Sequence, residues 1–592
     1  MKGERRMVLN LIDSPAELKK QDIPHLKILA DEMRKALIEK ASMVGGHLPS
    51  NLGVVELTIA LHYVFSSPKD HMIFDVSHQS YCHKMLTGRK NAFINPEEYD
   101  SVGGFTDPEE SIHDIFNVGH TSTSISLACG MAKARDLLGT NEEVIAIIGD
   151  GALSGGEAME GLNYASELNS NMIIVVNDNQ MSIAENHGGL YPHLKQLRDS
   201  EGSYQNNIFK SFGLEYIYEA DGHNIEKLIA MLNKAKQAKK AVVCHVCTEK
   251  GHGYEFAINN KEGFHWASPF NVDTGTSKRK RNNNNYGYIV SEYLLKKIKK
   301  DKKVAVITAA MPVNIGFNKE KRDLAGSQYI DVGIQEQHAL SMAAGMAKNG
   351  AKPVFATSAT FYQRALDQIE QEVCISKCPI TMIVTHASVY GYNSVTHCGF
   401  MDIPLLSNIP NLVYLAPTNK QEYIAMLDWS IEQSTYPVAI RVPWNGVHET
   451  GRKIEKNYDT LNKFEIVQQG EDVAIIGVGD FFQMGESIAN ILFSEYGIKA
   501  TVINPRYLTG VDEEILRNLS QNHKVVVTLE DGIVSGGYGS KISQFYALSE
   551  MKVINCGFKD NIPTHYNANE LMIQNELSEE TIVEKITREL EI

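Results

Sequence analysis

Oxygen-bearing side chains follow two apolar runs in the first half of the chain. The run "VIAIIGD" ends at Asp150, and "MIIVVND" is followed by Asn179, with Met181 close behind. A carboxylate, an amide oxygen and a backbone carbonyl are ligands that suit Mg²⁺, which completes its octahedron with phosphate oxygens. Gly151 lets the backbone approach a diphosphate closely, beside the amide groups of a helix that begins at about residue 152. The pattern favours one metal–diphosphate site, although two unrelated strand-to-helix turns would look the same.

The elements that must position these residues alternate along nearly the whole chain, as apolar runs and amphipathic or Ala-rich segments. This alternation indicates β-α-β units and parallel sheets, in which ligands bind outside the carboxyl ends of the strands. Three such blocks follow one another, at about 1–275, 286–450 and 465–592, and a basic, Asn-rich stretch, "SKRKRNNNNYG", separates the first two. We therefore expect an α/β protein of three doubly wound domains.

The composition argues against several classes of function. The net charge of −15 disfavours nucleic acid or an anionic membrane as the main partner. No apolar run approaches the roughly 20 residues that span a bilayer, and the N-terminus has no signal-peptide core, so we expect a cytoplasmic protein. Eight cysteines in 592 residues are too few for a disulfide framework.

Further segments carry a family resemblance beyond the two turns. The chain resembles the transketolase superfamily of thiamine diphosphate (ThDP) enzymes, and within it is most similar to the 1-deoxy-D-xylulose-5-phosphate synthase family. The resemblance covers essentially the whole chain. The segments are "GGHLPSNLGVVELTIALHYVF", "FDVSHQSYCHKMLTGR", "VGHTSTSISLACGMAKARDLLG", "EKGHGYEFA" and "DVGIQEQHALSMAAGMA".

The resemblance implies a domain order and two cofactors. It implies ThDP and Mg²⁺, with Asp150, Asn179 and Met181 as the metal ligands. The expected domains are a ThDP diphosphate- and Mg²⁺-binding domain at 1–276, a linker at 277–287, a pyrimidine-binding domain at 288–450 and a C-terminal transketolase domain at 451–592.

The resemblance also implies roles for individual residues. Glu336 in "IQEQHA" would hydrogen-bond the aminopyrimidine ring, with apolar surroundings that raise its pKa, and Phe361 would stack on that ring. His47, His265 and His397 would transfer protons to and from donor and acceptor oxygens. The other cofactor contacts that the family implies are His78, Gly119, His120, Thr121, Gly151, Ala152, Asn179 and Tyr254.

The sequence departs from the synthase pattern where the acceptor's phosphate would bind. The family has an arginine before its "G-x-D-G-x-T-H" loop, where this chain has His386, and the aspartate of that loop is Asn393. Trp444 stands at the arginine of "Y-P-R-G-N", and Ser358 stands at a tyrosine. The loss of two guanidinium groups that grip phosphate bidentately predicts a flatter, less charged acceptor pocket.

The activity implied is carboligation, in which a keto donor such as pyruvate or a ketose is cleaved and joined to an aldehyde acceptor. We expect activity of the synthase family, associated with isoprenoid and thiamine biosynthesis, in a homodimer without nucleic-acid or membrane partners. One alternative is a paralogous transketolase-like enzyme with a different acceptor, such as a non-phosphorylated aldehyde. An inactive scaffold paralogue is a second alternative, but retention of Asp150, Asn179, Glu336 and His47 argues against it.

Overall fold

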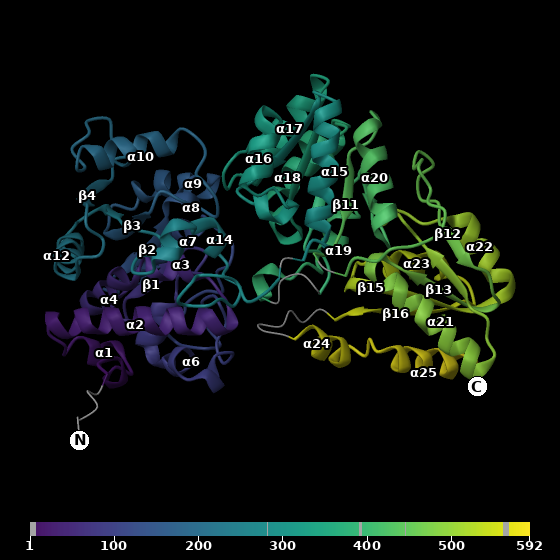
Figure 1. Cartoon of the computed structure of the whole chain (residues 1–592), viewed down its shortest axis with the longest axis horizontal. Coiled ribbons are helices and arrows are strands. Elements are labelled where there is room, and N and C mark those ends of the chain that lie inside the picture. Colours follow the sequence, from purple (N-terminus) through teal and green to yellow (C-terminus); the bar gives the residue numbers. More distant parts are fainter. Residues whose placement is uncertain (1–6, 281, 390–393, 445, 560–566) are drawn as a thin grey trace. The chain divides into compact units, whose positions relative to one another are not determined.

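The computed structural model describes residues 7–280, 282–389, 394–444, 446–559 and 567–592. The chain forms two compact units: unit 1 contains residues 1–281 with 333–335, and unit 2 contains residues 282–332 with 336–592. Unit 1 holds one parallel sheet and unit 2 holds two further sheets (Figure 1). The prediction of an α/β protein with three domains built on parallel sheets is confirmed.

The sheet of unit 1 has five parallel strands in the order β1-β2-β3-β5-β4. Its central strands are runs of buried Val and Ile, as expected for a sheet that is covered on both faces. Gly149 pairs with Asn177, so the carboxyl ends of β2 and β3 lie side by side. The strands are β1 (His71–Phe74), β2 (Val144–Gly149), β3 (Met172–Asp178), β4 (Glu215–Glu219) and β5 (Ala241–Cys247).

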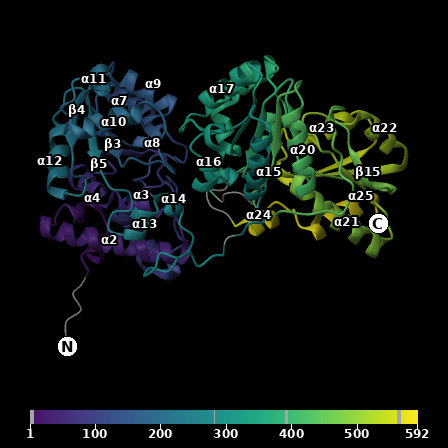
Figure 2. The same cartoon turned by 45° about the horizontal axis from the view of Figure 1, so that its top comes forward.

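Helices cover both faces of this first sheet. One apolar cluster joins one face to α7 and α9, and a second joins the other face to α4 and α12, so the two pairs lie on opposite sides (Figure 1, Figure 2). These helices are α4 (Val55–Val64), α7 (Ser124–Leu138), α9 (Gly156–Ala165) and α12 (Ile225–Lys236). The arrangement leaves the loops after the strands at one edge, where the predicted ligands begin.

The second sheet, in unit 2, has six parallel strands in the order β10-β11-β9-β8-β6-β7. Helix α17 packs on one face, and α15 and α20 pack on the other. The strands are β6 (Val304–Thr308), β7 (Tyr329–Asp331), β8 (Lys352–Ser358), β9 (Thr381–Thr385), β10 (Val413–Leu415) and β11 (Val438–Arg441). The helices are α15 (Tyr286–Lys300), α17 (Glu336–Lys348) and α20 (Lys420–Glu432).

The third sheet has the order β12-β14-β13-β15-β16, with only β12 antiparallel. Helices α21 and α25 pack on one face, while α22 and α23 share a single apolar cluster with the second sheet, which accounts for the two sheets forming one unit. The strands are β12 (Glu465–Gln468), β13 (Asp472–Gly477), β14 (Thr501–Asn504), β15 (His523–Ile533) and β16 (Lys552–Phe558). The helices are α21 (Phe482–Tyr496), α22 (Glu513–Asn522), α23 (Tyr538–Tyr546) and α25 (Glu579–Leu590).

The boundary between the units and the start of α15 at Tyr286 both fall in the stretch 277–287 that was expected as a linker. The detailed domain limits stay a prediction. Among the helices described, none combines the length and apolarity that a bilayer crossing requires.

Candidate active site

The two predicted oxygen ligands of unit 1 lie together at the carboxyl edge of its sheet. Asp150 opens the short helix α8 (Asp150–Leu153) directly after β2, and Asn179 follows β3. Both side chains are buried, and Asn186 donates from Nδ2 to Oδ2 of Asp150 at 2.7 Å. Burial and the nearby charge of Asp178 raise the pKa of Asp150, against a smaller effect of hydrogen bonding from Asn186 and the Asn179 backbone.

This corner of unit 1 fits a cation. A bound cation would stabilise the ionised form of the buried Asp150 carboxylate. Beside it, Oδ1 of Asn186 is buried and makes no hydrogen bond within the described residues, so it is available as a further oxygen ligand. The backbone of Met181 pairs with Glu185 in the turn after Asn179. The donor set is therefore one of hard oxygens, which suits Mg²⁺.

The backbone around α8 leaves no room for larger side chains. A Cβ added at Gly151 would lie 2.8 Å from Cβ of Ser182. Ala152 is buried and its carbonyl accepts from Oγ of Ser122 at 2.7 Å, which joins α8 to the loop that carries Gly119, His120 and Thr121. The segments that the family resemblance assigns to the diphosphate therefore lie next to one another.

Three predicted histidines converge in unit 1 from three different loops. His47 precedes α3 (Leu48–Leu52), His78 follows β1, and His265 follows α14 (Lys261–Phe264). The ring centroids are 5.0 Å apart for His47 and His78, 5.5 Å for His47 and His265, and 5.6 Å for His78 and His265. Burial lowers the pKa of His47 and of His265 well below the usual value, so both rings are neutral at pH 7.

Lys250 belongs to the same cluster and was missed in the sequence. Its ammonium is buried, donates to the carbonyl of Ser182 and lies 3.1 Å from Nδ1 of His265. Burial lowers the pKa of Lys250 to about 7, the opposing effect of Asp150 being smaller. The residue lies in the family segment "EKGHGYEFA", from which Tyr254 alone was selected.

Tyr254 itself packs among apolar rings. Its hydroxyl donates to the carbonyl of Val272 at 2.8 Å, and its ring contacts Phe264 and Phe270. Within the described residues, neither a hydrogen bond nor a ring contact joins Tyr254 to the three histidines.

In unit 2, Glu336 is the first residue of α17 and is 3% exposed. Burial raises the pKa of its carboxyl, although Arg364, with Nη1 at 3.9 Å from Oε2, opposes the shift. Oε2 is buried and makes no hydrogen bond within the described residues, so it can bind the ring nitrogen of a ligand. The 3-10 segment η6 (Ala359–Ala365) packs on α17 and carries Phe361, whose ring lies 5.6 Å from that of His397 at 74°.

The positions at which the sequence predicts a departure from the synthase pattern are largely buried where the structure describes them. The rings of His386 and Trp444 stack with centroids 4.9 Å apart and an interplanar angle of 7°. Burial lowers the pKa of His386 to about 3. Ser358 is buried and its hydroxyl accepts from Nδ2 of Asn314 at 2.6 Å. Asn393 lies outside the described residues.

Arg441, an arginine close to Trp444 in the sequence, is held by two buried carboxylates. It is 3% exposed; Nε donates to Oδ2 of Asp402 at 2.7 Å and Nη1 donates to Asp531. The guanidinium therefore joins the second sheet to the third.

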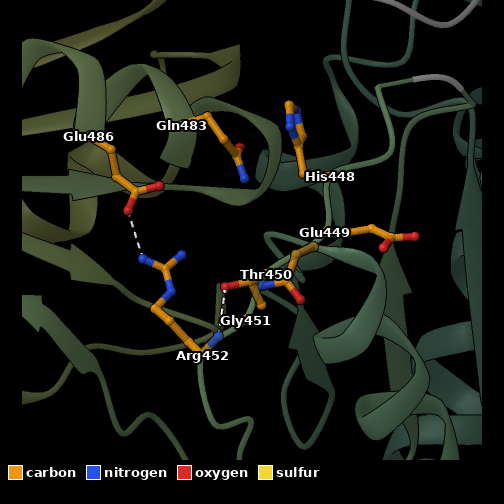
Figure 3. A pocket seen from close by; sticks show the side chains of 8 residues that line it. His448, Glu449, Thr450, Gly451, Arg452, Gln483 and Glu486 are labelled. Atoms are coloured by element: carbon orange, nitrogen blue, oxygen red, sulfur yellow. Dashed lines mark hydrogen bonds and ion pairs between the residues drawn. The ribbon is translucent and has the colours of Figure 1, made fainter.

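A pocket of about 300 Å³ in unit 2 contains none of the predicted residues (Figure 3). Arg452 in this pocket pairs with Glu486 at 2.6 Å, and Glu449 pairs with Lys420 at 2.9 Å, so its charges neutralise one another. The lining residues are Asn419, His448, Glu449, Thr450, Gly451, Arg452, Gln483 and Glu486.

Comparison with known families first defines the class. Residues 284–447 match the transketolase pyrimidine-binding domain and residues 462–582 match the transketolase C-terminal domain, so the chain is of transketolase type. Residues 9–207 and 201–248 match the family described as 1-deoxy-D-xylulose-5-phosphate synthase.

Curated relatives named 1-deoxy-D-xylulose-5-phosphate synthase agree with this assignment. Those from Halothermothrix orenii and Clostridium acetobutylicum are each 38% identical to this chain, in alignments that cover 98% of it. The alignments cover 96% and 99% of these relatives, respectively. The relative from Clostridium perfringens is 39% identical over 94% of this chain and 96% of its own length. The chain belongs to the 1-deoxy-D-xylulose-5-phosphate synthase family, which confirms the family resemblance.

Proposed function

We propose that the chain is a ThDP- and Mg²⁺-dependent transferase that joins the two-carbon fragment of a keto donor, pyruvate first, to an aldehyde. The observation that carries this proposal is that Oε2 of Glu336 is buried and makes no hydrogen bond within the described residues. It belongs to a chain that is similar to the synthases over 98% of its length. ThDP, when bound, supplies a nucleophilic carbon for the cleavage and formation of C–C bonds.

The residues of unit 1 would hold the cofactor's charged end. Asp150 and Asn179, with the carbonyl of Met181, would bind Mg²⁺, and the free oxygen of Asn186 adds a further candidate ligand. The backbone at Gly151 and Ala152 would approach the diphosphate without steric hindrance. In unit 2, Glu336 would fix the orientation of the pyrimidine ring.

The neutral histidines of unit 1 are suited to proton transfer. A neutral imidazole both accepts a proton at one nitrogen and donates at the other. His47 and His265 are neutral because burial lowers their pKa, and Nδ1 of His47 makes no hydrogen bond within the described residues. We assign these two rings to substrate oxygens, and we propose proton transfer as the task of His397 as well.

Two acceptors are candidates. Glyceraldehyde 3-phosphate follows from the family, and an aldehyde without phosphate is favoured by one observation: His386, stacked on Trp444, is buried with its pKa lowered to about 3 and therefore carries no charge at pH 7. A neutral ring cannot replace an arginine on a phosphate, and each lost charged hydrogen bond weakens binding by about 1.5–3 kcal/mol. Arg441 does not compensate, because Asp402 and Asp531 hold it.

The test of the reaction class is ThDP-dependent turnover of pyruvate with an aldehyde, by the wild type and by Glu336→Ala. Absence of turnover by the wild type with any keto donor would refute the enzyme proposal and favour the inactive scaffold. For the acceptor, kcat/KM is compared between glyceraldehyde 3-phosphate and glyceraldehyde. A preference above about 100-fold for the phosphorylated aldehyde, the lower end of what two charged hydrogen bonds contribute, would exclude the second candidate.

We also propose that the protein is a homodimer, as the family resemblance implies. Light scattering coupled to size exclusion tests this directly, since a mass of one chain at micromolar concentration contradicts it.

A further inference from the structure

The three segments of unit 1 that would hold the cofactor are joined by one chain of hydrogen bonds. Asp75, fully buried after β1, accepts from the backbone N–H of Ser122 at 2.7 Å and from that of Ser124 at 3.0 Å. Ser122 in turn donates from Oγ to the carbonyl of Ala152 at 2.7 Å. The loop with His78, the loop before α7 and helix α8 are therefore tied together by Asp75 and Ser122.

Both loops contain residues with positive φ, a backbone conformation that is unfavourable for residues other than glycine. Val76 and Ser77 have φ of 59° and 65°, and Ser122 has φ of 75°. A left-handed conformation is a true outlier for a β-branched residue such as Val76, and it persists only where the surrounding structure fixes it. Ser77 directly precedes His78 and Ser122 directly follows Thr121, so the strain is located at the predicted binding residues.

Further contacts fix the same loops. Ser77 donates from Oγ to the carbonyl of Val118 at 2.6 Å and accepts from the backbone N–H of Thr106 at 2.9 Å. A Cβ added at Gly155, just after α8, would lie 2.1 Å from Oγ of Ser122. The segment after α8 thus packs directly on the Ser122 hydroxyl, and displacement of one segment displaces the others.

We propose that Asp75 and Ser122 are positioning residues. Together with their hydrogen bonds they form a clasp, which holds the His78 loop, the 118–123 loop and α8 in the arrangement that binds the cofactor's diphosphate. The inference rests on the proposed function. A carboxylate is required at position 75 because its two oxygens accept two separate N–H groups. An asparagine offers one acceptor oxygen and turns an N–H₂ group toward the second donor.

The chain contains a matched control for this substitution. Asp70, at the other end of β1, is also buried and also accepts two backbone N–H groups, from Ser66 at 2.7 Å and from Glu143 at 3.0 Å. Asp70→Asn therefore removes the same chemistry without touching the three loops. Ser122→Ala is a milder second variant, because it keeps both bonds of Asp75 and removes only the bond to Ala152.

The experiment is calorimetric titration of ThDP, with Mg²⁺, into cofactor-free wild type and the three variants, with thermal unfolding of each. We expect Asp75→Asn and Asp70→Asn to lower Tm similarly, while the ThDP Kd rises at least tenfold for Asp75→Asn and less than twofold for Asp70→Asn. Ser122→Ala should raise the Kd severalfold. At saturating ThDP, kcat of Asp75→Asn should recover to within about threefold of the wild type.

Hydrogen exchange tests the clasp separately from the proposed function, because it needs no cofactor. Asp75→Asn should increase amide exchange in residues 118–124 and 150–155 of the cofactor-free protein, and Asp70→Asn should not. A wild type that binds no ThDP overturns the proposed function, and with it the role of the clasp toward the cofactor. Normal ThDP binding by the wild type and by both clasp variants, or equal weakening by Asp70→Asn, overturns the clasp alone.

Discussion

Replacement of Arg441 by leucine should destabilise unit 2 far more than loss of a surface ion pair would. Its Nε and Nη1 donate to the carboxylates of Asp402 and Asp531. Its Nη2 also donates to the carbonyl of Asp531 at 3.2 Å and to Oδ1 of Asp402 at 3.3 Å. All three side chains are buried. Arg441→Leu would therefore leave two buried carboxylates without their cation.

The expected loss is about 3–5 kcal/mol in the free energy of unfolding, which is the usual cost of removing one partner from a buried ion pair. At about 2–3 °C per kcal/mol for a unit of this size, Tm should fall by roughly 6–15 °C. The double variant Arg441→Leu/Asp531→Asn should recover part of this loss, because it also removes one of the stranded charges.

The loss should also depend on pH. Burial, which outweighs Arg441, raises the pKa of Asp531 above its ordinary 3.8, and removal of Arg441 raises it further. An acid with a raised pKa in the folded state binds protons on folding, so stability falls as pH rises from 3.8 through the folded value. The Tm difference between wild type and Arg441→Leu should therefore be larger at pH 7.5 than at pH 5.

Differential scanning calorimetry of the unit 2 transition measures these differences, with Arg452→Leu as the control. Arg452 and Glu486 form a pair in the same unit that is 37% exposed on both sides, and such pairs contribute about 0–1 kcal/mol. The reasoning is refuted if Arg441→Leu costs no more than Arg452→Leu. It is equally refuted if the Asp531→Asn effect adds fully to that of Arg441→Leu.

Two shorter predictions concern the cofactor residues. Glu336→Gln should lower kcat by about 100-fold or more if the carboxyl also exchanges a proton with the pyrimidine ring that it hydrogen-bonds, while ThDP binding measured by calorimetry changes less than tenfold. Gly155→Ala should weaken ThDP binding at least tenfold because its Cβ would meet Oγ of Ser122 at 2.1 Å, whereas Gly156→Ala, with no neighbour within 4 Å, should bind normally. Adding Ser122→Gly to Gly155→Ala should lower the Kd again, but only to the severalfold-raised value of Ser122→Ala, because the bond to Ala152 is lost as well; no recovery at all would contradict the steric explanation.

The fold could be predicted because burial of a strand or helix face requires a local pattern of apolar residues in the sequence. Strands such as β2 and β3 are continuous apolar runs, and the residues after them lie at one sheet edge by the geometry of parallel strands alone. Asp150 and Asn179 therefore come together without any knowledge of side-chain packing. The convergence of His47, His78 and His265 was expected only through the family, since their loops are far apart in the sequence.

Other residues of the site left no local signal. Lys250 and Asn186 matter because of what lies beside them, and their types are those of ordinary surface residues. Asp75 was hidden for a different reason: it caps the backbone of a helix that begins about fifty residues later. Sequence spacing cannot reveal a contact that tertiary structure alone creates.

The acceptor side shows why a basic residue in the sequence is not the same as a charge in the structure. A histidine where the family resemblance implies an arginine looks like exchange of one basic side chain for another, but burial lowers the pKa of His386 to about 3. The ring is thus neutral at pH 7, and it stacks on Trp444. Acceptor preference should consequently show no titration of His386 between pH 5 and 9, and any pH dependence of phosphate recognition must come from the phosphate itself or from groups other than this ring.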